Sequence, residues 1–180
     1  SYGQMGNGAS TSYQYTPVSV SDISTAASVS AGNDHTCAAL SGGKVKCWGN
    51  GSYGQMGNGA TGSQSTPVSV GITGLATSDV ISTATSVSAG GNHTCAVLSG
   101  GTIKCWGYGY YGQLGNGSTS DQTTPVSVSG ISTATSVSAG FRHTCAVLSG
   151  GTVKCWGYGN YGQLGNGSTS DQTTPVSVSG

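Results

Sequence analysis

Three pairs of cysteines are the residues of this chain best suited to chemistry. The two members of each pair lie ten positions apart, and a histidine stands two positions before the first of them. Imidazole and thiolate groups could together bind zinc or copper, whereas oxidised cysteines would instead form one disulfide in each copy. Because zinc normally takes four ligands and each copy offers three, we expect disulfides beside a buried histidine that hydrogen-bonds backbone. The residues concerned are Cys37, Cys47, Cys95, Cys105, Cys145 and Cys155, with His35, His93 and His143.

A tight hairpin would bring each cysteine pair together. Residues 37–40 and 44–47 flank Ser41-Gly42-Gly43, where glycine permits the positive φ angles of a hairpin turn. Folding the chain about Gly42 places Cys37 opposite Cys47, and directly opposed Cβ atoms are close enough for a disulfide. Each bond would stabilise its unit by roughly 2–3 kcal/mol. Regular oxidised pairs are typical of proteins outside the cell, so we expect an extracellular or cell-surface location.

Other residues capable of catalysis are scarce. The chain has no glutamate, and its aspartates form no close pair that could divide acid and base roles. There is no Gly-x-Ser-x-Gly motif, and the glycine-rich stretch 106–112 lacks the Gly-Lys-Ser/Thr ending of a phosphate-binding loop. We therefore expect a protein that is not an enzyme and that needs no cofactor or metal.

The composition favours an all-β protein and excludes two classes of partner. Hydrophobic residues make up 34% of the chain and charged residues only 6%, and the formal net charge is zero. Such a chain has no basic surface to attract nucleic acid and no apolar run of about 18 residues to span a membrane. Alternating apolar and small polar residues at 18–20 and 27–31 are typical of half-buried strands.

Two sequence landmarks show that the chain is a tandem array with a period of about 50 residues. We predict one domain over residues 1–180, with three full units, a terminal fragment and a loop insertion at 71–80. Gly-Gln-(Met/Leu)-Gly-Asn-Gly starts at Gly3, Gly54, Gly112 and Gly162, and Thr-Pro-Val-Ser-Val starts at Thr16, Thr66, Thr124 and Thr174.

The order of motifs within one unit resembles a known repeat family. Val87-Ser-Ala-Gly90-Gly-Asn-His93-Thr is followed by Leu98-Ser-Gly-Gly101, then Trp106-Gly107, then Tyr111-Gly112-Gln113-Leu114-Gly115. This succession is similar to the repeats of the regulator of chromosome condensation family. The resemblance implies four-stranded antiparallel blades, either as part of a closed β-propeller or as an open superhelical array. It also implies a role as an interaction scaffold. Paired cysteines are not a general feature of the family's eukaryotic members.

Aromatic residues and asparagines supply the remaining candidate sites. We expect Trp48, Trp106 and Trp156 to form a structural core with the three histidines. The tyrosines at 108–111, 158 and 161 either pack turns or form an exposed row for a glycan or a protein. Four sequons suit N-glycosylation if the chain is secreted, although Asn-Gly turns explain two of them equally well. The sequons start at Asn50, Asn92, Asn116 and Asn166.

These features give two hypotheses for function. The first is an extracellular structural protein whose units build a fibre, sheath or surface appendage by head-to-tail completion between copies of the chain. Near-identical units and unpaired sheet edges at both ends favour this hypothesis. The alternative is a secreted or cell-surface propeller module that binds a protein or a glycan, which the family resemblance favours.

Overall fold

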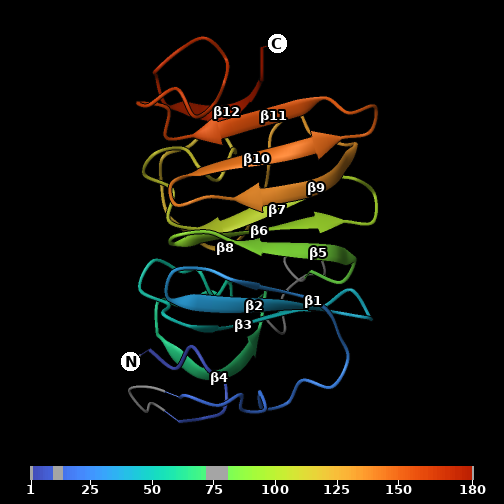
Figure 1. The fold of residues 1–180 in the computed structure, drawn as a ribbon, viewed down its shortest axis with the longest axis vertical. Helices are drawn as coiled ribbons and strands as arrows, with labels where there is room; N and C mark the ends of the chain where they lie inside the picture. Colours follow the sequence, from blue (N-terminus) through green and yellow to red (C-terminus); the bar gives the residue numbers. More distant parts are fainter. Residues whose placement is uncertain (1, 10–13, 72–80, 180) are drawn as a thin grey trace.

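The computed structural model describes residues 2–9, 14–71 and 81–179, and it folds into three stacked four-stranded antiparallel sheets (Figure 1). We call the sheets blades 1 to 3 in chain order. Within the described residues there is no helix, and hence none long and apolar enough to cross a membrane. The predicted all-β array of blades is confirmed, and the sheets do not close into a ring. The predicted loop insertion lies almost wholly at 72–80, outside the described residues.

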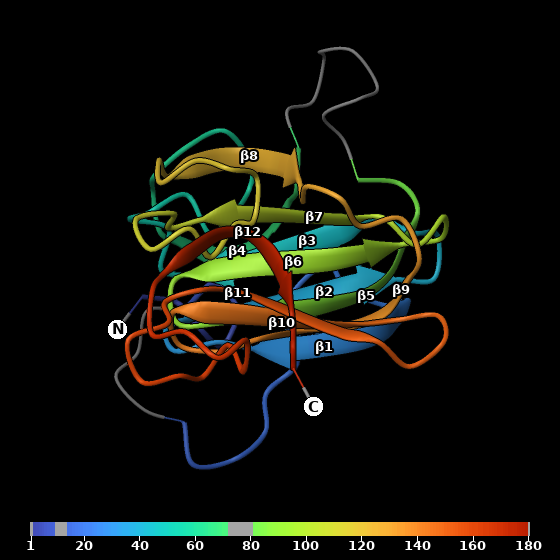
Figure 2. The same ribbon diagram turned by 90° about the horizontal axis from the view of Figure 1, so that it is seen from above.

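Each blade contains its strands in sequence order, so neighbours in the sheet are neighbours in the chain. Most of these strands lie at a similar orientation across the stack, and neighbouring strands of a blade point in opposite directions (Figure 2). Blade 1 consists of β1 (Ala26–Ala31), β2 (His35–Leu40), β3 (Val45–Gly49) and β4 (Gln64–Ser69). Blade 2 consists of β5 (Ala84–Ala89), β6 (His93–Leu98), β7 (Ile103–Gly107) and β8 (Gln122–Ser127). Blade 3 consists of β9 (Ala134–Ala139), β10 (His143–Leu148), β11 (Val153–Gly157) and β12 (Gln172–Ser177).

The central hairpin of each blade has the predicted register. In blade 1, Cys37 pairs with Cys47, and the turn closes through a hydrogen bond from the Gly43 N–H to the Leu40 carbonyl, 2.8 Å long. Gly43 has a φ of 76°, which favours glycine at this corner. The register recurs in the other two blades, so all three cysteine pairs are directly opposed.

One predicted strand is absent. Residues 18–20 form no strand, although the equivalent residues 68–69 lie in β4. The difference has a simple cause, because β4 exists by pairing with β3, and no such strand lies beside 18–20 in the described structure. Pro67, Pro125 and Pro175 lie within the edge strands β4, β8 and β12, where a missing N–H costs least.

Most of the hydrophobic core lies between the blades. Ala39 and Val45 of blade 1 belong to one buried cluster with Val87 and Trp106 of blade 2. An equivalent cluster joins blade 2 to blade 3. Each blade therefore buries its apolar faces only against its neighbours, as in other repeat proteins.

The innermost strands β1, β5 and β9 approach one another closely. The Ala89 N–H donates to the Ser30 hydroxyl of the preceding blade at 2.9 Å, and the Ala139 N–H donates to Ser88 at 3.0 Å. A Cβ atom on Gly90 would lie 2.4 Å from the Gly140 carbonyl oxygen, so only glycine fits at this contact. The Ser-Ala-Gly landmark thus sets the spacing between blades.

Candidate functional site

The three cysteine pairs form disulfides. In each blade the Cα atoms of the pair lie 4.1 Å apart, and both sulfurs are bonded to each other. The thiolates that a zinc or copper site would need are therefore consumed. The described residues contain no group of three side chains placed to hold a metal ion.

A short chain of hydrogen bonds links blade 1 to blade 2. The main-chain carbonyl of Gln55, in the turn after β3, accepts the Trp106 indole N–H at 2.9 Å. The same carbonyl accepts the Thr94 hydroxyl at 3.3 Å, and Nε2 of His35 lies 2.8 Å from that hydroxyl. Blade 1 thus supplies the histidine and the carbonyl, whereas blade 2 supplies the threonine and the tryptophan.

The joint between blades 2 and 3 repeats this arrangement. The Gln113 carbonyl accepts the Trp156 indole N–H and the Thr144 hydroxyl, each at 2.9 Å. Nε2 of His93 lies 2.8 Å from the Thr144 hydroxyl. We call this set of contacts the blade joint. The expectation that each histidine bonds backbone within its own hairpin was wrong for His35 and His93, since each bonds the threonine of the next blade.

The buried histidines are neutral and carry their proton on Nε2. Burial lowers the pKa of His35 to about 4, although Asp34 acts in the opposite direction, and it lowers the pKa of His93 to about 3, helped by His35 and His143. Nδ1 of both rings has no hydrogen-bond partner, so a proton there would be buried without an acceptor. The Nε2–H therefore donates to threonine, whose hydroxyl donates onward to the glutamine carbonyl.

The turns that contain Gln55 and Gln113, which we call the glutamine turns, lie directly on a tryptophan of the next blade, and this contact requires glycine. A Cβ atom at Gly57 would come within 2.7 Å of the Trp106 Nε1, and one at Gly115 within 2.6 Å of the Trp156 Nε1. Both glycines also have positive φ angles, 67° and 69°. The spacing of glycines in Gly-Gln-(Met/Leu)-Gly thus reflects the docking of this turn on the next blade.

At the N-terminal end, residues 2–8 make a partial version of the same joint. The Gln4 carbonyl accepts the Trp48 indole N–H at 2.8 Å and lies 3.5 Å from the Thr36 hydroxyl. The Gly8 N–H donates to the Ser65 carbonyl at 2.9 Å, as Gly59 does to Thr123 in the next joint. In the part of the chain that the structure describes, this turn packs on blade 1 with no four-stranded sheet behind it.

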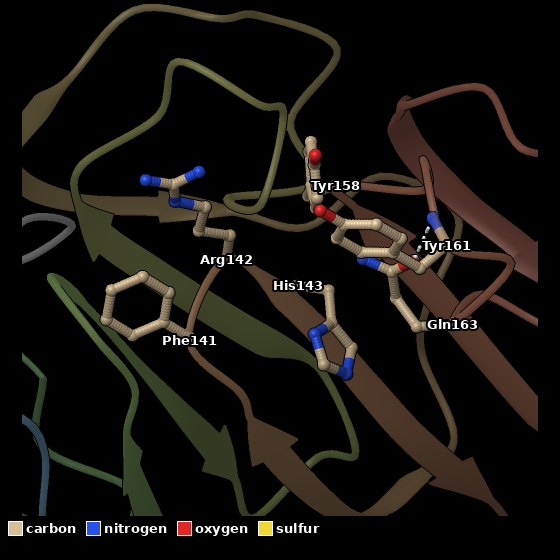
Figure 3. Close-up of a pocket in the computed structure, with 6 residues that line it drawn as sticks. All are labelled: Phe141, Arg142, His143, Tyr158, Tyr161 and Gln163. Atoms are coloured by element: carbon tan, nitrogen blue, oxygen red, sulfur yellow. Dashed lines mark hydrogen bonds between the residues drawn. The ribbon is translucent and has the colours of Figure 1, made fainter.

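On blade 3 the equivalent groups have no blade packed against them within the described residues, and we call this arrangement the open joint. A cavity of about 340 Å³ is bordered by the aromatic rings, guanidinium and imidazole shown in Figure 3. The Gln163 side chain accepts the Tyr161 N–H at 2.9 Å, whereas neither the His143 side chain nor the Gln163 main-chain carbonyl has a hydrogen-bond partner within the described residues. Burial still lowers the pKa of His143. The lining residues are Phe141, Arg142, His143, Tyr158, Tyr161 and Gln163.

The tyrosines form a continuous row along one side of the stack, which we call the tyrosine ladder. Successive ring centroids lie 4.8, 6.1, 5.0 and 5.9 Å apart. Tyr110 packs beside the row, and the Arg142 guanidinium lies 4.8 Å from the Tyr111 ring centroid. Because the rings meet mostly edge to face, they stabilise one another as well as the turns that carry them. The ladder consists of Tyr53, Tyr108, Tyr111, Tyr158 and Tyr161.

The four sequon asparagines have unequal environments. Asn50 is only 8% exposed, and its side-chain oxygen accepts the Ser52 N–H at 2.9 Å. Asn116 and Asn166 make the same local contact with Ser118 and Ser168 but are partly exposed, as is Asn92. Burial disfavours modification of Asn50, and glycosylation of the other three stays a prediction.

Sequence reasoning missed the partners of the histidines and tryptophans. The glutamine carbonyl and the threonine hydroxyl that complete each joint belong to motifs that were used only as landmarks. Their recurrence at fixed positions in every unit marked them as constrained, but it does not indicate which residue of the next unit each one contacts. The aspartates of the polar loops also have a structural role, since Asp121 accepts the Gly109 N–H at 2.9 Å and Asp171 accepts the Gly159 N–H at 2.8 Å.

Four-stranded antiparallel blades that stack face to face define a protein of the β-propeller type. The chain belongs to the regulator of chromosome condensation (RCC1) repeat family, whose model matches residues 1–39, 42–97, 101–147 and 150–180. A second RCC1 repeat model matches residues 26–55, 84–113 and 134–163. The predicted family is confirmed.

Similar proteins share the repeats over part of their length. The ultraviolet-B receptor UVR8 of Arabidopsis thaliana is 37% identical over 101 residues, which are 56% of this chain and 22% of the receptor. The probable E3 ubiquitin-protein ligase HERC4 of Mus musculus is 40% identical over 100 residues, 55% of this chain and 9% of that protein. The chain thus spans less than a quarter of either relative.

Solved structures show the same fold. Human WBSCR16 superimposes with a TM-score of 0.80 at 26% identity, over 98% of this chain and 44% of that one. Prp20p of Saccharomyces cerevisiae gives 0.74 at 20% identity, over 88% of this chain and 39% of that one.

Proposed function

We propose that this chain is a non-catalytic protein-binding module that joins head to tail with further copies of itself in an extracellular structural array. The observation that carries the proposal is the blade joint itself, because both interior joints unite two blades of one type through the same groups. On blade 3, His143 and Gln163 have the positions that engage threonine and tryptophan in those joints. A blade of the same type therefore fits this face of blade 3.

The apolar surfaces on the outer faces of blades 1 and 3 also favour another copy of this chain as the partner. Val147 on β10 is 37% exposed, whereas its equivalent Val97 is 2% exposed under blade 3. At the other end Val29 on β1 is 67% exposed, whereas its equivalent Val87 is 8% exposed. In both interior joints these two kinds of surface cover each other, so each end offers what the other lacks.

Two further observations support the protein-binding role and the extracellular location in the proposal. Prp20p structures concern its binding properties to Gsp1p and histones and its complex with Kap60, so repeats of this fold serve protein binding elsewhere. For this chain, three disulfides in 180 residues favour a compartment in which thiols stay oxidised.

The proposal predicts concentration-dependent assembly. Sedimentation velocity and negative-stain electron microscopy across a dilution series should show oligomers that lengthen with concentration and dissociate on reduction. Val147→Asp should weaken assembly at least tenfold, because it places a charge in the apolar joint. Thr119→Asp, which adds the same charge at an exposed site in the loop between β7 and β8 of blade 2, is the matched control. A monomer at every concentration up to the millimolar range would refute the proposal.

A second candidate function is ligand binding by the tyrosine ladder. In the described structure no hydrogen bond engages the hydroxyl groups of these tyrosines. Two of the ladder rings are exposed and three are partly exposed, and rings that also carry free hydroxyl donors suit a glycan or an extended peptide.

The ladder hypothesis can be tested separately from assembly. Tyr110 is exposed, lies beside the ladder and contributes to neither blade joint. We expect Tyr110→Ser to weaken binding to a hit from a glycan array about tenfold, measured by calorimetry, and Tyr15→Ser to leave it unchanged. Equal effects of the two variants would argue against the ladder as the binding site.

A further inference from the structure

Two units of the array differ at only four positions. Residues 81–130 and 131–180 are otherwise identical, and one of the four differences is the small apolar exchange of Ile103 for Val153. Each of the other three places an aromatic ring or a charge where the equivalent position has asparagine or glycine. Blades 2 and 3 have the same strand register, so the fold does not require these three side chains. They are Tyr110 in place of Asn160, Phe141 in place of Gly91 and Arg142 in place of Asn92.

The three side chains gather at one point of the tyrosine ladder. The Tyr110 ring centroid lies 5.1 Å from that of Tyr111, and the Arg142 guanidinium lies 4.8 Å from the Tyr111 centroid. The same guanidinium lies 5.3 Å from the Phe141 ring centroid and 5.9 Å from that of Tyr158. We call these five side chains the arginine cluster. Blade 2 and blade 3 both contribute to it, so the cluster spans the interior joint between them.

The guanidinium of the cluster has no partner for its N–H donors. In the part of the chain that the structure describes, no hydrogen bond or ion pair engages the Arg142 side chain. The guanidinium points away from the His143 ring and toward the ladder (Figure 3). Asp121, the carboxylate beside the ladder turn, instead accepts the Gly109 N–H at 2.9 Å. Because arginine stays protonated in proteins, the cluster presents a permanent cation between aromatic rings.

We propose that the arginine cluster binds the carboxylate of an acidic saccharide of the uronic acid type. A guanidinium can place two parallel N–H donors against the two oxygens of one carboxylate. The negative face of a tyrosine ring attracts the C–H groups of a sugar, and the tyrosine hydroxyls can pair with sugar hydroxyls. This inference rests on the ligand-binding function proposed above for the ladder, and it names the class of ligand. It does not depend on head-to-tail assembly.

The position of the cluster favours a saccharide over a peptide. An extended peptide pairs its backbone with the edge of a sheet, whereas the ladder tyrosines lie in the turns that follow β3, β7 and β11. Acidic and phosphorylated peptides are recognised by clusters of arginine, and Arg142 is the only arginine of this chain. A single guanidinium beside rings that carry hydroxyl groups instead matches a ligand with one charge and many hydroxyls, as in a uronic acid.

Matched ligands can isolate the carboxylate. Calorimetry with an oligogalacturonate, in which every sugar carries one carboxylate, should show binding that weakens as salt is added. Its methyl ester keeps the same sugar rings without the charge and should bind about tenfold more weakly. A sulfated dextran oligosaccharide supplies the same kind of oxyanion from another source. Equal binding of the acid and its ester, or tighter binding of the sulfated ligand, would overturn the assignment of a carboxylate.

Matched variants can assign this binding to Arg142. Arg142→Asn installs the residue that the equivalent position 92 carries, so the blade should fold, and oligogalacturonate binding should weaken about tenfold. Arg142→Lys keeps the charge but loses the paired donors, so its affinity should lie between those of Arg142→Asn and the unmodified chain. Lys44→Asn removes the same charge from the exposed turn between β2 and β3, at the other end of the strands, and should leave binding unchanged.

The outcomes separate this inference from the ladder function. If Tyr110→Ser weakens saccharide binding while Arg142→Asn does not, the ladder binds sugars without recognising a carboxylate, and this inference alone fails. It also fails alone if a glycan array gives only neutral ligands and oligogalacturonate does not bind. If the array gives no ligand and oligogalacturonate does not bind, both this inference and the ladder function fail.

Discussion

Reduction of the three disulfides is expected to unfold the array at denaturant concentrations that leave the oxidised protein intact. The three loops do not overlap, so their contributions add, and each closed loop of this length is worth roughly 2–3 kcal/mol. Their sum approaches the entire stability of an ordinary domain, about 5–15 kcal/mol. Urea unfolding followed by tryptophan fluorescence, with and without a phosphine reductant, measures the difference directly.

The position of each disulfide in the stack should decide the size of its effect. Blade 2 takes part in both interior joints, whereas blade 3 takes part in one. Replacing Cys95 and Cys105 by alanine should therefore lower the urea midpoint more than replacing Cys145 and Cys155. In the native protein Cys145 is partly exposed, so the blade 3 disulfide should also be reduced first. Equal midpoints for the two double variants would contradict a stability that is transmitted from blade to blade.

The sequence predicted what is local to one unit. The hairpin register follows from two glycines between alternating strands, and the cysteine pairing follows from that register. The buried tryptophans were also expected, because large aromatic side chains are few here and recur at one position of every unit. Family membership could be inferred for the same reason, since its landmarks are turns and close contacts that each repeat must keep.

What connects one unit to the next could not be predicted in this way. The partner of His35 is Thr94, 59 positions along the chain, and no periodic pattern within one unit indicates such a contact. The loss of the strand at 18–20 is likewise a property of neighbours, because an edge strand forms only where another strand pairs with it. The ladder was visible as tyrosine-rich turns, but its continuity depends on how the blades stack.

The blade joint connects stability to the proposed assembly. Its hydrogen bonds determine which surface can dock, because the histidine and the glutamine carbonyl of one blade must meet the threonine and the tryptophan of the other in one geometry. Its apolar half supplies contact area, through valines and alanines that each blade presents on both faces. The proposed assembly would use the same two halves, and therefore the conditions that break an interior joint should also dissociate copies of the chain.

Acid should destabilise the array through its buried histidines. An unfolded histidine has a pKa near 6.5, whereas burial lowers the pKa of His35 to about 4 and that of His93 to about 3. Above pH 6.5 both states are neutral, and the contribution to stability is complete. Below pH 6.5 the unfolded chain binds protons that the folded chain excludes. The free energy of unfolding then falls by about 1.4 kcal/mol per pH unit for each histidine. This loss ends once the pH is below the pKa of the histidine in the folded protein.

Urea unfolding at several pH values between 7 and 4.5 should therefore show a loss of roughly 2–3 kcal/mol per pH unit below pH 6 from these two residues together. His93→Gln separates this effect from that of other acidic groups. Its amide can still donate to the Thr144 hydroxyl, but it does not titrate, so the slope should fall by about half. Nδ1 of His93 faces the Cα of Gly90, where a Cβ would lie 2.8 Å away, so a second ring proton has no acceptor. An unchanged slope in His93→Gln would show that acid acts elsewhere in the molecule.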